Sequence, residues 1–456
     1  MFRRLLRNYC QYVGKRKICP IEAVGARCIV PLQRNVGFSR NPLSPCKVAE
    51  NASSATNEIV SKEEKTMPSQ LLSNRILEIG FSKIREVMGK VEAAKRKGIA
   101  ITDLSIGRPD FDTPVHIKEA AAKALADGWV HYTASAGTLE LREALCHRFQ
   151  EDYRLKIDPA EILVTTGAAE AIFIGLMSVL NPEDEVLVPE PMYVYYPGYA
   201  SFGGAKCVPI PLKEENQFLL KADYLEKFIT EKTKVLILNS PHNPTGQVFL
   251  QEDLEPIARL AQRRNILVVS DDIYNGMLYD GAEHFPIAKA PGMKERTLII
   301  GSFSKTYAMD GWRIGYLIAP GEVITQALKL HQHIVSCPNT FVQVGAQAAL
   351  TASQDCVRRM TAEFDRRRKA LMARLDEIGL PYVRPRGAFY VFPSIKKFGL
   401  PSARFADFLL EKARAAVVPG DAFGPQGEGY VRISYCAPVE EIEKGMDRVR
   451  SALAEL

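Results

Sequence analysis

The sequence predicts an α/β fold, with a large domain built on a mostly parallel sheet between helices and a smaller α+β domain after it. Two observations support this prediction. Between residues 115 and 325, short apolar runs bounded by turn residues alternate with amphipathic helical patterns. After them come long helical patterns and a second, shorter group of apolar runs. Repeated alternation of strand and helix is typical of parallel sheets covered by their crossover helices.

The elements follow in order along the chain. Residues 68–114 begin with helical spacing and are expected to form an N-terminal segment that joins the small domain. In the large domain, residues 115–325, helices are predicted over 116–125, 139–149 and 253–264, and strands over 161–166, 185–190, 206–212, 234–239, 265–271 and 297–303. A helix over 323–334 leads into the small domain, residues 326–456, which has a helix over 357–379, strands over 387–393, 415–420 and 430–436, and a final helix.

The first 67 residues have a different composition from the rest. Residues 1–48 contain seven arginines and three lysines against one acid, Glu22, so they carry more positive charge than the whole chain, whose net charge is +6. Residues 50–68 are polar and rich in serine and glutamate, as linkers are. A basic, acid-poor, amphipathic start is typical of an organelle transit peptide. We therefore expect a presequence and linker over 1–67 and import into a mitochondrion, with a plastid as the alternative.

Two other interpretations of the basic segment stay open. It could be an extension that is not a presequence, in which case the protein would be cytoplasmic, or an arm that binds nucleic acid. The rest of the chain, 46% hydrophobic and 25% charged overall, has ordinary globular composition. No apolar run is long enough to span a membrane, and the nine cysteines form no CxxC pair or metal-like cluster. We expect no membrane, nucleic-acid or metal partner, and we expect His331 and His333 to be solvated.

Polar residues follow several predicted strands at the point where each strand ends. Taken singly, each group is explained by a turn or a helix cap. Taken together they predict a ligand site, because ligands of open α/β sheets bind beyond the carboxyl ends of the strands. The groups are Gly167, Ala168 and Ala169 after the first strand, Asn239 and Asn243 after the fourth, Asp271 and Tyr274 after the fifth, and Ser302, Ser304, Lys305 and Arg313 after the sixth.

These residue types suit a phosphorylated ligand. Two serine hydroxyls and the guanidinium of Arg313 can hold a phosphate dianion. The small residues 167–169 start a helix whose backbone N–H groups can receive phosphate. A lysine beside that phosphate and among apolar neighbours can have a lowered pKa and attack a carbonyl as a free amine. The prediction is a site for covalent catalysis around Lys305.

Three motifs carry a resemblance that covers about residues 70–456. SFSKTYAMDGWRIGY, NSPHNPTG and VVSDDIY together resemble the class I/II aminotransferases, which are pyridoxal-phosphate enzymes of fold type I. The resemblance implies that Lys305 forms the Schiff base with pyridoxal 5'-phosphate and moves the proton. It implies that Asp271 pairs with the pyridinium nitrogen, and that Tyr274 and Asn243 contact the phenolic oxygen of the cofactor.

The resemblance implies further roles. The phosphate cup would be formed by Gly167, Ala168, Ala169, Ser302, Ser304 and Arg313, and the ring of Tyr193 would lie over the pyridine. Gly107 and Arg432, assisted by Asn243, would hold the substrate α-carboxylate. Tyr132 matches a tyrosine that reaches the phosphate of the neighbouring subunit, which implies a homodimer with shared active sites.

The implied reaction moves the amino group of an L-amino acid to a 2-oxo acid by a ping-pong mechanism. The alternative is a lyase or synthase on the same fold, such as a carbon–sulfur β-lyase or an aminocyclopropane-type synthase. Three departures from the family pattern matter. Tyr193 replaces the commoner tryptophan, Ala169 stands where acid-specific relatives carry a lysine, and Arg108 replaces the more usual glutamate. Because of Ala169, we expect neutral or aromatic donors to compete well with aspartate, unless Arg108 supplies the missing charge.

Overall fold

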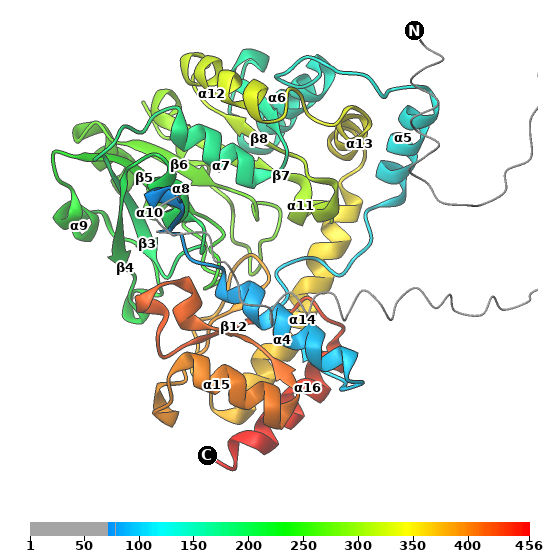
Figure 1. The fold of residues 1–456 in the computed structure, drawn as a ribbon, viewed down its shortest axis with the longest axis vertical. Coiled ribbons are helices and arrows are strands. Elements are labelled where there is room, and N and C mark those ends of the chain that lie inside the picture. Colours follow the sequence, from blue (N-terminus) through cyan, green and yellow to red (C-terminus); the bar gives the residue numbers. More distant parts are fainter. Residues whose placement is uncertain (1–71, 78) are drawn as a thin grey trace, which may run out of the picture. The chain divides into compact units, whose positions relative to one another are not determined.

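A seven-stranded sheet organises the computed structural model, which describes residues 72–77 and 79–456 (Figure 1). Its strand order is β2-β8-β7-β6-β5-β3-β4. The strands are β2 (Ile162–Thr165), β3 (Glu185–Glu190), β4 (Lys206–Pro211), β5 (Thr233–Asn239), β6 (Leu267–Asp271), β7 (Thr297–Ser302) and β8 (Gly315–Ile318). All neighbouring strands run parallel except β8, which is antiparallel to both β2 and β7. The predicted α/β class with a mostly parallel sheet is confirmed.

The strand β8 was not among the predicted strands. It follows β7 after residues 303–314, a connection that holds the four-residue helix α11 (Phe303–Thr306) and a three-residue 3-10 helix over Asp310–Trp312. A parallel neighbour needs a crossover of about a dozen residues or more, usually with a helix that packs on the sheet. The helical pieces of this connection are only four and three residues long, so it has no such crossover helix, and β8 returns antiparallel to β7. The connection contains Lys305 and Arg313.

Both faces of the sheet are buried. Successive side chains of a strand point to opposite faces, and on each face they pack into a different apolar cluster. Val235 and Ile237 of β5 pack into one apolar cluster, and Leu236 and Leu238 pack into another. Helices cover the sheet on its two sides (Figure 1). The helices of this part are α5 (Val115–Ala126), α6 (Leu139–Tyr153), α7 (Ala168–Met177), α8 (Tyr196–Phe202), α9 (Ala222–Leu225), α10 (Gln251–Arg263), α11 (Phe303–Thr306), α12 (Gly321–Ile334) and α13 (Thr340–Thr351).

The C-terminal part is built on a long helix and a small antiparallel sheet. Helix α14 (Asp355–Ile378) runs for 24 residues and ends at Gly379, whose φ of 69° is the left-handed conformation that favours glycine at helix ends. The antiparallel sheet β11-β12-β9 contains β9 (Tyr390–Val391), β11 (Val418–Pro419) and β12 (Val431–Ser434). The other elements are α15 (Ser402–Phe408), α16 (Val439–Leu453) and β10 (Ala415–Ala416).

The segment before the large sheet also contacts this C-terminal part. Strand β1 (Thr102–Asp103) pairs in parallel with β10. The helices that precede β1 are α3 (Asn74–Leu77) and α4 (Lys83–Arg96). The predicted limits of the two domains stay a prediction, and the predicted presequence and linker over 1–67 lie outside the described residues. Within the described part, no helix is both long and apolar enough to cross a membrane.

Candidate active site

The predicted phosphate cup is assembled from three elements. Gly167 precedes α7 with a φ of +84°, and a Cβ built on it would lie 2.6 Å from Nη2 of Arg313. A Cβ on Gly315 would lie 2.8 Å from the backbone nitrogen of Ala168. Only residues without a side chain therefore allow this close approach of the α7 start to the β7–β8 connection. Ala169 follows Ala168 in the first turn of α7 and is half-buried.

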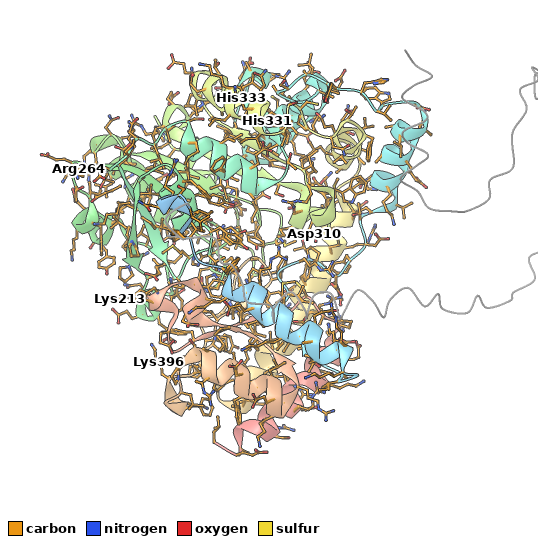
Figure 2. All side chains as sticks on the ribbon, in the orientation of Figure 1. Lys213, Arg264, Asp310, His331, His333 and Lys396 are labelled. Carbon is orange, nitrogen blue, oxygen red and sulfur yellow. The ribbon has the colours of Figure 1, made fainter. Side chains whose placement is uncertain are left out.

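The polar groups of the predicted cup differ in how many partners they have inside the protein. The hydroxyl of Ser302 accepts from the backbone N–H of Ser304 at 3.0 Å and lies within donor distance of the Ser304 hydroxyl, at 2.9 Å, and of the backbone oxygen of Ile314, at 3.4 Å. Arg313 donates to the backbone oxygen of Asp310, a residue labelled in Figure 2, at 3.0 Å. Among the described residues, no carboxylate pairs with Arg313. A cation and two hydroxyls beside the N-terminus of a ten-residue helix suit an anion.

Lys305 lies in α11, directly after the cup. Its Nζ donates to the backbone oxygen of Gly107 at 2.6 Å and lies 6.0 Å from the ring centre of Phe389. Burial lowers the pKa of Lys305 to about 8, and the positive charges of Arg432 and Arg313 act in the same direction. A lysine in this state is partly a free amine near neutral pH, as a nucleophile must be.

Asp271, the last residue of β6, is 1% exposed. One carboxylate oxygen accepts a hydrogen bond from the Tyr196 hydroxyl at 2.5 Å, and the other accepts from the N–H of Ile273 at 3.4 Å. Burial raises the pKa of Asp271 to about 7; the bond from Tyr196 lowers it, and the nearby charge of Asp272 raises it. The prediction missed Tyr196. The run of tyrosines in YVYYPGY was the available signal, but it does not say which ring meets the carboxylate.

Arg432, in β12, is 2% exposed and lies between the rings of Tyr390 and Phe423, at 4.3 and 5.1 Å. It donates to Oδ1 of Asn243 at 3.0 Å and to the backbone oxygen of Ser105 at 2.8 Å. Its Nε is buried without a hydrogen-bond partner. A buried guanidinium that no carboxylate of the described part neutralises is suited to an acidic ligand.

Gly107 and Asn243 are fixed on the two sides of Arg432. A Cβ on Gly107 would lie 2.9 Å from the Tyr390 hydroxyl and 3.7 Å from Nη2 of Arg432, so the loop approaches through its backbone. The N–H of Asn243 donates to Oδ1 of Asn239 at 2.8 Å, and Nδ2 of Asn239 donates to the backbone oxygen of Asp271 at 2.9 Å. Asn239 thus ties the ends of β5 and β6 together.

The predicted aromatic residues lie close by. The hydroxyls of Tyr274 and Tyr390 are hydrogen-bonded at 2.9 Å, and both residues are buried. Tyr390, which the prediction also missed, therefore connects Tyr274 to Arg432. Phe423, missed as well, contacts the guanidinium of Arg432 only on its own side. The ring of Tyr193 packs edge-on against that of Tyr196, with 5.4 Å between ring centres. Contacts and close approaches thus link the predicted site residues, Tyr132 excepted, into groups at one edge of the sheet.

Tyr132 is the site residue that stands apart. Its side chain is 88% exposed and lines a cavity of about 470 Å³ with Trp129 and Phe341. Arg108 is also exposed and has no ion pair within the described residues.

The expectation that His331 is solvated is wrong. Its side chain, labelled in Figure 2, is fully buried, and Nδ1 lies 2.8 Å from Oε1 of Glu170. The other oxygen of Glu170 accepts from the N–H of Thr166 at 2.6 Å. The reason is that α12 packs on α7, so this face of the helix turns inward. His333, two residues further, is exposed as expected.

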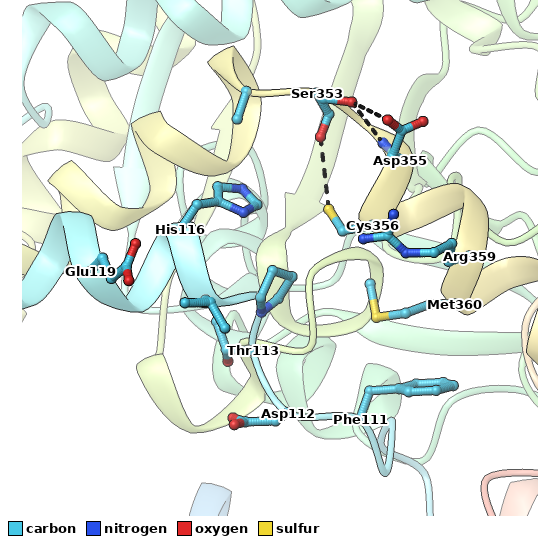
Figure 3. Close-up of a pocket in the computed structure, with 13 residues that line it drawn as sticks. Phe111, Asp112, Thr113, His116, Glu119, Ser353, Asp355, Cys356, Arg359 and Met360 are labelled. Carbon is cyan, nitrogen blue, oxygen red and sulfur yellow. Dashed lines mark hydrogen bonds between the residues drawn. The ribbon is translucent and has the colours of Figure 1, made fainter.

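A second cavity, of about 920 Å³, lies between the start of α5 and the start of α14 (Figure 3). His116, Cys356 and Arg359 are among the residues that line it. The thiol of Cys356 donates to the backbone oxygen of Ser353 at 3.9 Å. None of the predicted site residues borders this cavity, so it is separate from the site. No group of three or more metal-binding side chains occurs in the described residues.

A lysine of lowered pKa, a buried carboxylate and a group of anion-binding donors thus lie near the strand ends of an α/β sheet, where the ligands of such sheets bind. The chain matches the family model described as aminotransferase class I and II over residues 99–449, and it belongs to this family. It is a pyridoxal-phosphate-dependent aminotransferase, whose substrates are amino acids and 2-oxo acids.

Individual relatives agree with this assignment. The chain is 45% identical to an aspartate aminotransferase of Pyrococcus abyssi and 43% identical to aromatic-amino-acid aminotransferase 2 of Thermococcus litoralis. Each match covers 84% of this chain and 98% of the relative. The aspartate aminotransferase from Thermus thermophilus with maleate superposes with a TM-score of 0.81 at 39% identity, covering 84% of this chain and 99% of that one.

The comparisons contradict the prediction of import into a mitochondrion or plastid, which is wrong. The similar proteins are archaeal and bacterial enzymes, including those of Pyrococcus, Thermococcus and Methanocaldococcus, from cells that contain neither organelle. The prediction was based only on the amino-acid composition of the basic segment, and composition alone does not show that an import system recognises it.

Proposed function

We propose that Lys305 is the residue that carries the cofactor and moves the proton in this aminotransferase. The placement of Lys305 is the observation that carries the proposal. Its amine reaches the substrate loop at Gly107, and Arg313 and Arg432 are close enough to contribute to its lowered pKa. Neither guanidinium has a carboxylate partner in the described residues, so both are available for the anionic groups of a ligand.

The residues present fit pyridoxal 5'-phosphate. Arg313, Ser302, Ser304 and the N-terminus of α7, with Gly167, Ala168 and Ala169, would hold its phosphate, because these groups are donors with few internal acceptors. Asp271 would pair with the ring nitrogen. The hydroxyl of Tyr274 and the amide of Asn243 would contact the phenolic oxygen, and Tyr193 would pack on the ring. When bound, the cofactor withdraws electrons from the substrate Cα and so stabilises the negative charge that develops there.

Lys305 acts as nucleophile and then as base. Its amine would be the group that carries the cofactor, because burial keeps that amine partly unprotonated near neutral pH. When it does not carry the cofactor, Nζ would be the group that takes the proton from the substrate Cα and returns it on the cofactor side. Because burial lowers its pKa to about 8, Lys305 can exchange this proton close to neutral pH.

Arg432 orients the substrate. Its planar fork can bind the α-carboxylate through two parallel N–H bonds, and Gly107 approaches it from the other side. The rings of Tyr390 and Phe423 restrict the guanidinium. A fixed carboxylate determines which Cα bond lies perpendicular to the cofactor ring, and therefore which bond breaks.

The protein acts as a homodimer in which Tyr132 of each subunit completes the phosphate cup of the other. The exposure of apolar side chains beside it supports this: Trp129 and Val130, which line the same cavity, are 45% and 58% exposed. A mixture of Lys305→Ala and Tyr132→Ala subunits tests it. Mixed dimers would contain one intact site, so activity should return on mixing. If neither variant gains activity after subunit exchange, the shared site is refuted.

A single half-reaction tests the proposed reaction. Cofactor-loaded protein is mixed with an amino acid and no oxo acid, and the products are quantified. We expect one equivalent of 2-oxo acid per active site, with the amino group kept on the cofactor. A lyase would instead release ammonia over many turnovers, which would contradict the proposal.

A further inference from the structure

Asp271 lies in surroundings that oppose its charge. It is 1% exposed, and burial raises its pKa to about 7. Its proposed role beside the ring nitrogen requires the charged form. Two hydrogen bonds reach it, from the hydroxyl of Tyr196 at 2.5 Å and from the N–H of Ile273 at 3.4 Å. The first is short and comes from a side chain that is itself 2% exposed.

A second carboxylate adds to the opposition. Asp272 is 3% exposed, and its charge disfavours the charge on Asp271. Its Oδ1 accepts from the hydroxyl of Ser270 at 2.7 Å. Its Oδ2 lies 3.3 Å from Nε2 of His284, whose side chain is also 3% exposed. Neither ring nitrogen of His284 has a hydrogen-bond partner, and Oδ2 of Asp272 has none either. Asp272 is therefore the polar group that this ring faces at close range.

The other titratable groups around these residues are neutral phenols and one distant acid. The ring of Tyr153 packs edge-on against His284 at 5.4 Å, and its hydroxyl accepts from Asn275. Tyr193, Tyr199, Tyr274 and Tyr316 have pKa values raised by burial, so they remain uncharged near neutral pH. Asp152 is an outer charge that acts on Tyr153. Tyr196, Asp272 and His284 are therefore the groups that can decide the state of Asp271.

We propose that Tyr196 is a positioning residue that keeps Asp271 ionised beside the cofactor ring, against the charge of Asp272, which His284 partly neutralises. Tyr196 donates one hydrogen bond to the charged form of Asp271, and a hydrogen bond to an ionised group favours that form. The ring of His284 lies 3.3 Å from Oδ2 of Asp272, where it can offset the charge of that carboxylate. The inference rests on the proposed pairing of Asp271 with the ring nitrogen.

The first experiment measures Asp271 directly, without the cofactor. The full-length apo-protein is labelled with ¹³C at aspartate side-chain carboxyls, and the Asp271 signal is the one lost in Asp271→Asn. In Tyr196→Phe we expect its titration midpoint to rise by about one to two pH units, the size expected for one lost hydrogen bond to a charged oxygen. In Asp272→Asn we expect the midpoint to fall.

Two controls separate these roles from a general loss of packing. Tyr279→Phe removes a buried hydroxyl that donates to the backbone oxygen of Ala388 at 2.6 Å and should leave the Asp271 midpoint unchanged. As a single substitution, His284→Asn should raise the titration midpoint of Asp271. In a protein that already carries Asp272→Asn, it should leave that midpoint unchanged. An unchanged midpoint in Tyr196→Phe overturns the role of Tyr196. A His284→Asn effect that persists without Asp272 overturns the role of His284.

The second experiment follows the holoenzyme loaded with cofactor labelled with ¹⁵N at the ring nitrogen. We expect the ¹⁵N shift of the wild type at the protonated position, and a displacement toward the unprotonated position in Tyr196→Phe. A shift that does not respond to Asp271→Asn would reject the proposed function of Asp271 itself. A shift that responds to Asp271→Asn but not to Tyr196→Phe would reject only this inference.

Discussion

The Arg432→Lys variant is the most informative single change at the substrate end of the site. Arg432 is 2% exposed and its guanidinium has no carboxylate partner in the described residues. A lysine keeps the positive charge but cannot present two parallel donors to a carboxylate. The substitution therefore removes one of the two charged hydrogen bonds that hold the α-carboxylate, and it leaves the general charge of the pocket in place.

The size of the effect follows from that count. A hydrogen bond to a charged group is worth about 1.5–3 kcal/mol. Since about 1.4 kcal/mol is tenfold, kcat/KM should fall by roughly one to two decades. The bond exists before and during the reaction, so most of the loss should appear in KM. The lysine also replaces the donor that Arg432 offers to Oδ1 of Asn243 and to the backbone oxygen of Ser105. The loss of these internal bonds should lower the free energy of unfolding and should not change which substrate is preferred.

The assay compares each amino donor with the amine that lacks its carboxylate. We expect kcat/KM to fall for the amino acid and to stay nearly constant for the amine, because the amine never used the missing bond. Arg384→Lys is the matched control: this arginine is 59% exposed and pairs with Asp280. If the amine loses as much as the amino acid, or if the amino acid loses nothing, Arg432 does not hold the α-carboxylate.

Three further predictions concern Lys305, Ala169 and Asp280. Because burial lowers the pKa of Lys305 to about 8, the rate at which apo-protein takes up the cofactor covalently should rise with pH through a midpoint near 8; a midpoint above 10 would contradict the assigned environment. Ala169→Lys should favour aspartate over an aromatic donor by about one to two decades in kcat/KM, whereas a strong preference of the wild type for aspartate would mean that Arg108 or another cation already supplies the charge. Arg368 is fully buried and binds Asp280 through two bonds of 2.7 and 2.8 Å, and it also pairs with Asp365 at 2.6 Å. Asp280→Ala should therefore reduce the free energy of unfolding in denaturant titrations by about 1.5–3 kcal/mol, the size of a lost hydrogen bond to a charged group. Arg368 and Arg384 hold the pKa of Asp280 well below its usual range. The stability that Asp280 contributes is therefore fully present above about pH 4 and is lost as the pH falls below that value. If Asp280→Ala lowers the free energy of unfolding equally at pH 3 and pH 7, this explanation is refuted.

Local patterns predicted most of the sheet and the groups at its edge. Strands such as β5 and β6 are short apolar runs that end in polar residues, and those residues meet because parallel strands end at the same edge. The same patterns did not predict β8, because its four residues, Gly315–Ile318, directly follow the motif that contains Arg313 and were interpreted as part of that motif. They did not predict α13 either, whose apolar positions continue the pattern of α12 after a short break.

Contacts between distant parts of the chain were beyond local patterns. Tyr196 and Asp271 are 75 positions apart, and nothing near either residue marks the other as its partner. The burial of His331 likewise depends on the packing of α12 against α7, which brings it to Glu170, 161 positions away. The exposed fraction of a side chain depends on such packing, so it was predictable for regular strands and not for single polar residues.

The covalent site of the cofactor is the most direct test of the central claim. Cofactor-loaded protein is reduced with borohydride, digested and analysed by mass spectrometry to find the modified lysine. We expect one modified peptide, containing Lys305, and no covalent cofactor in the Lys305→Ala variant. Fixation on a different lysine, or no fixation in active protein, would contradict the assignment of Lys305 and the mechanism built on it.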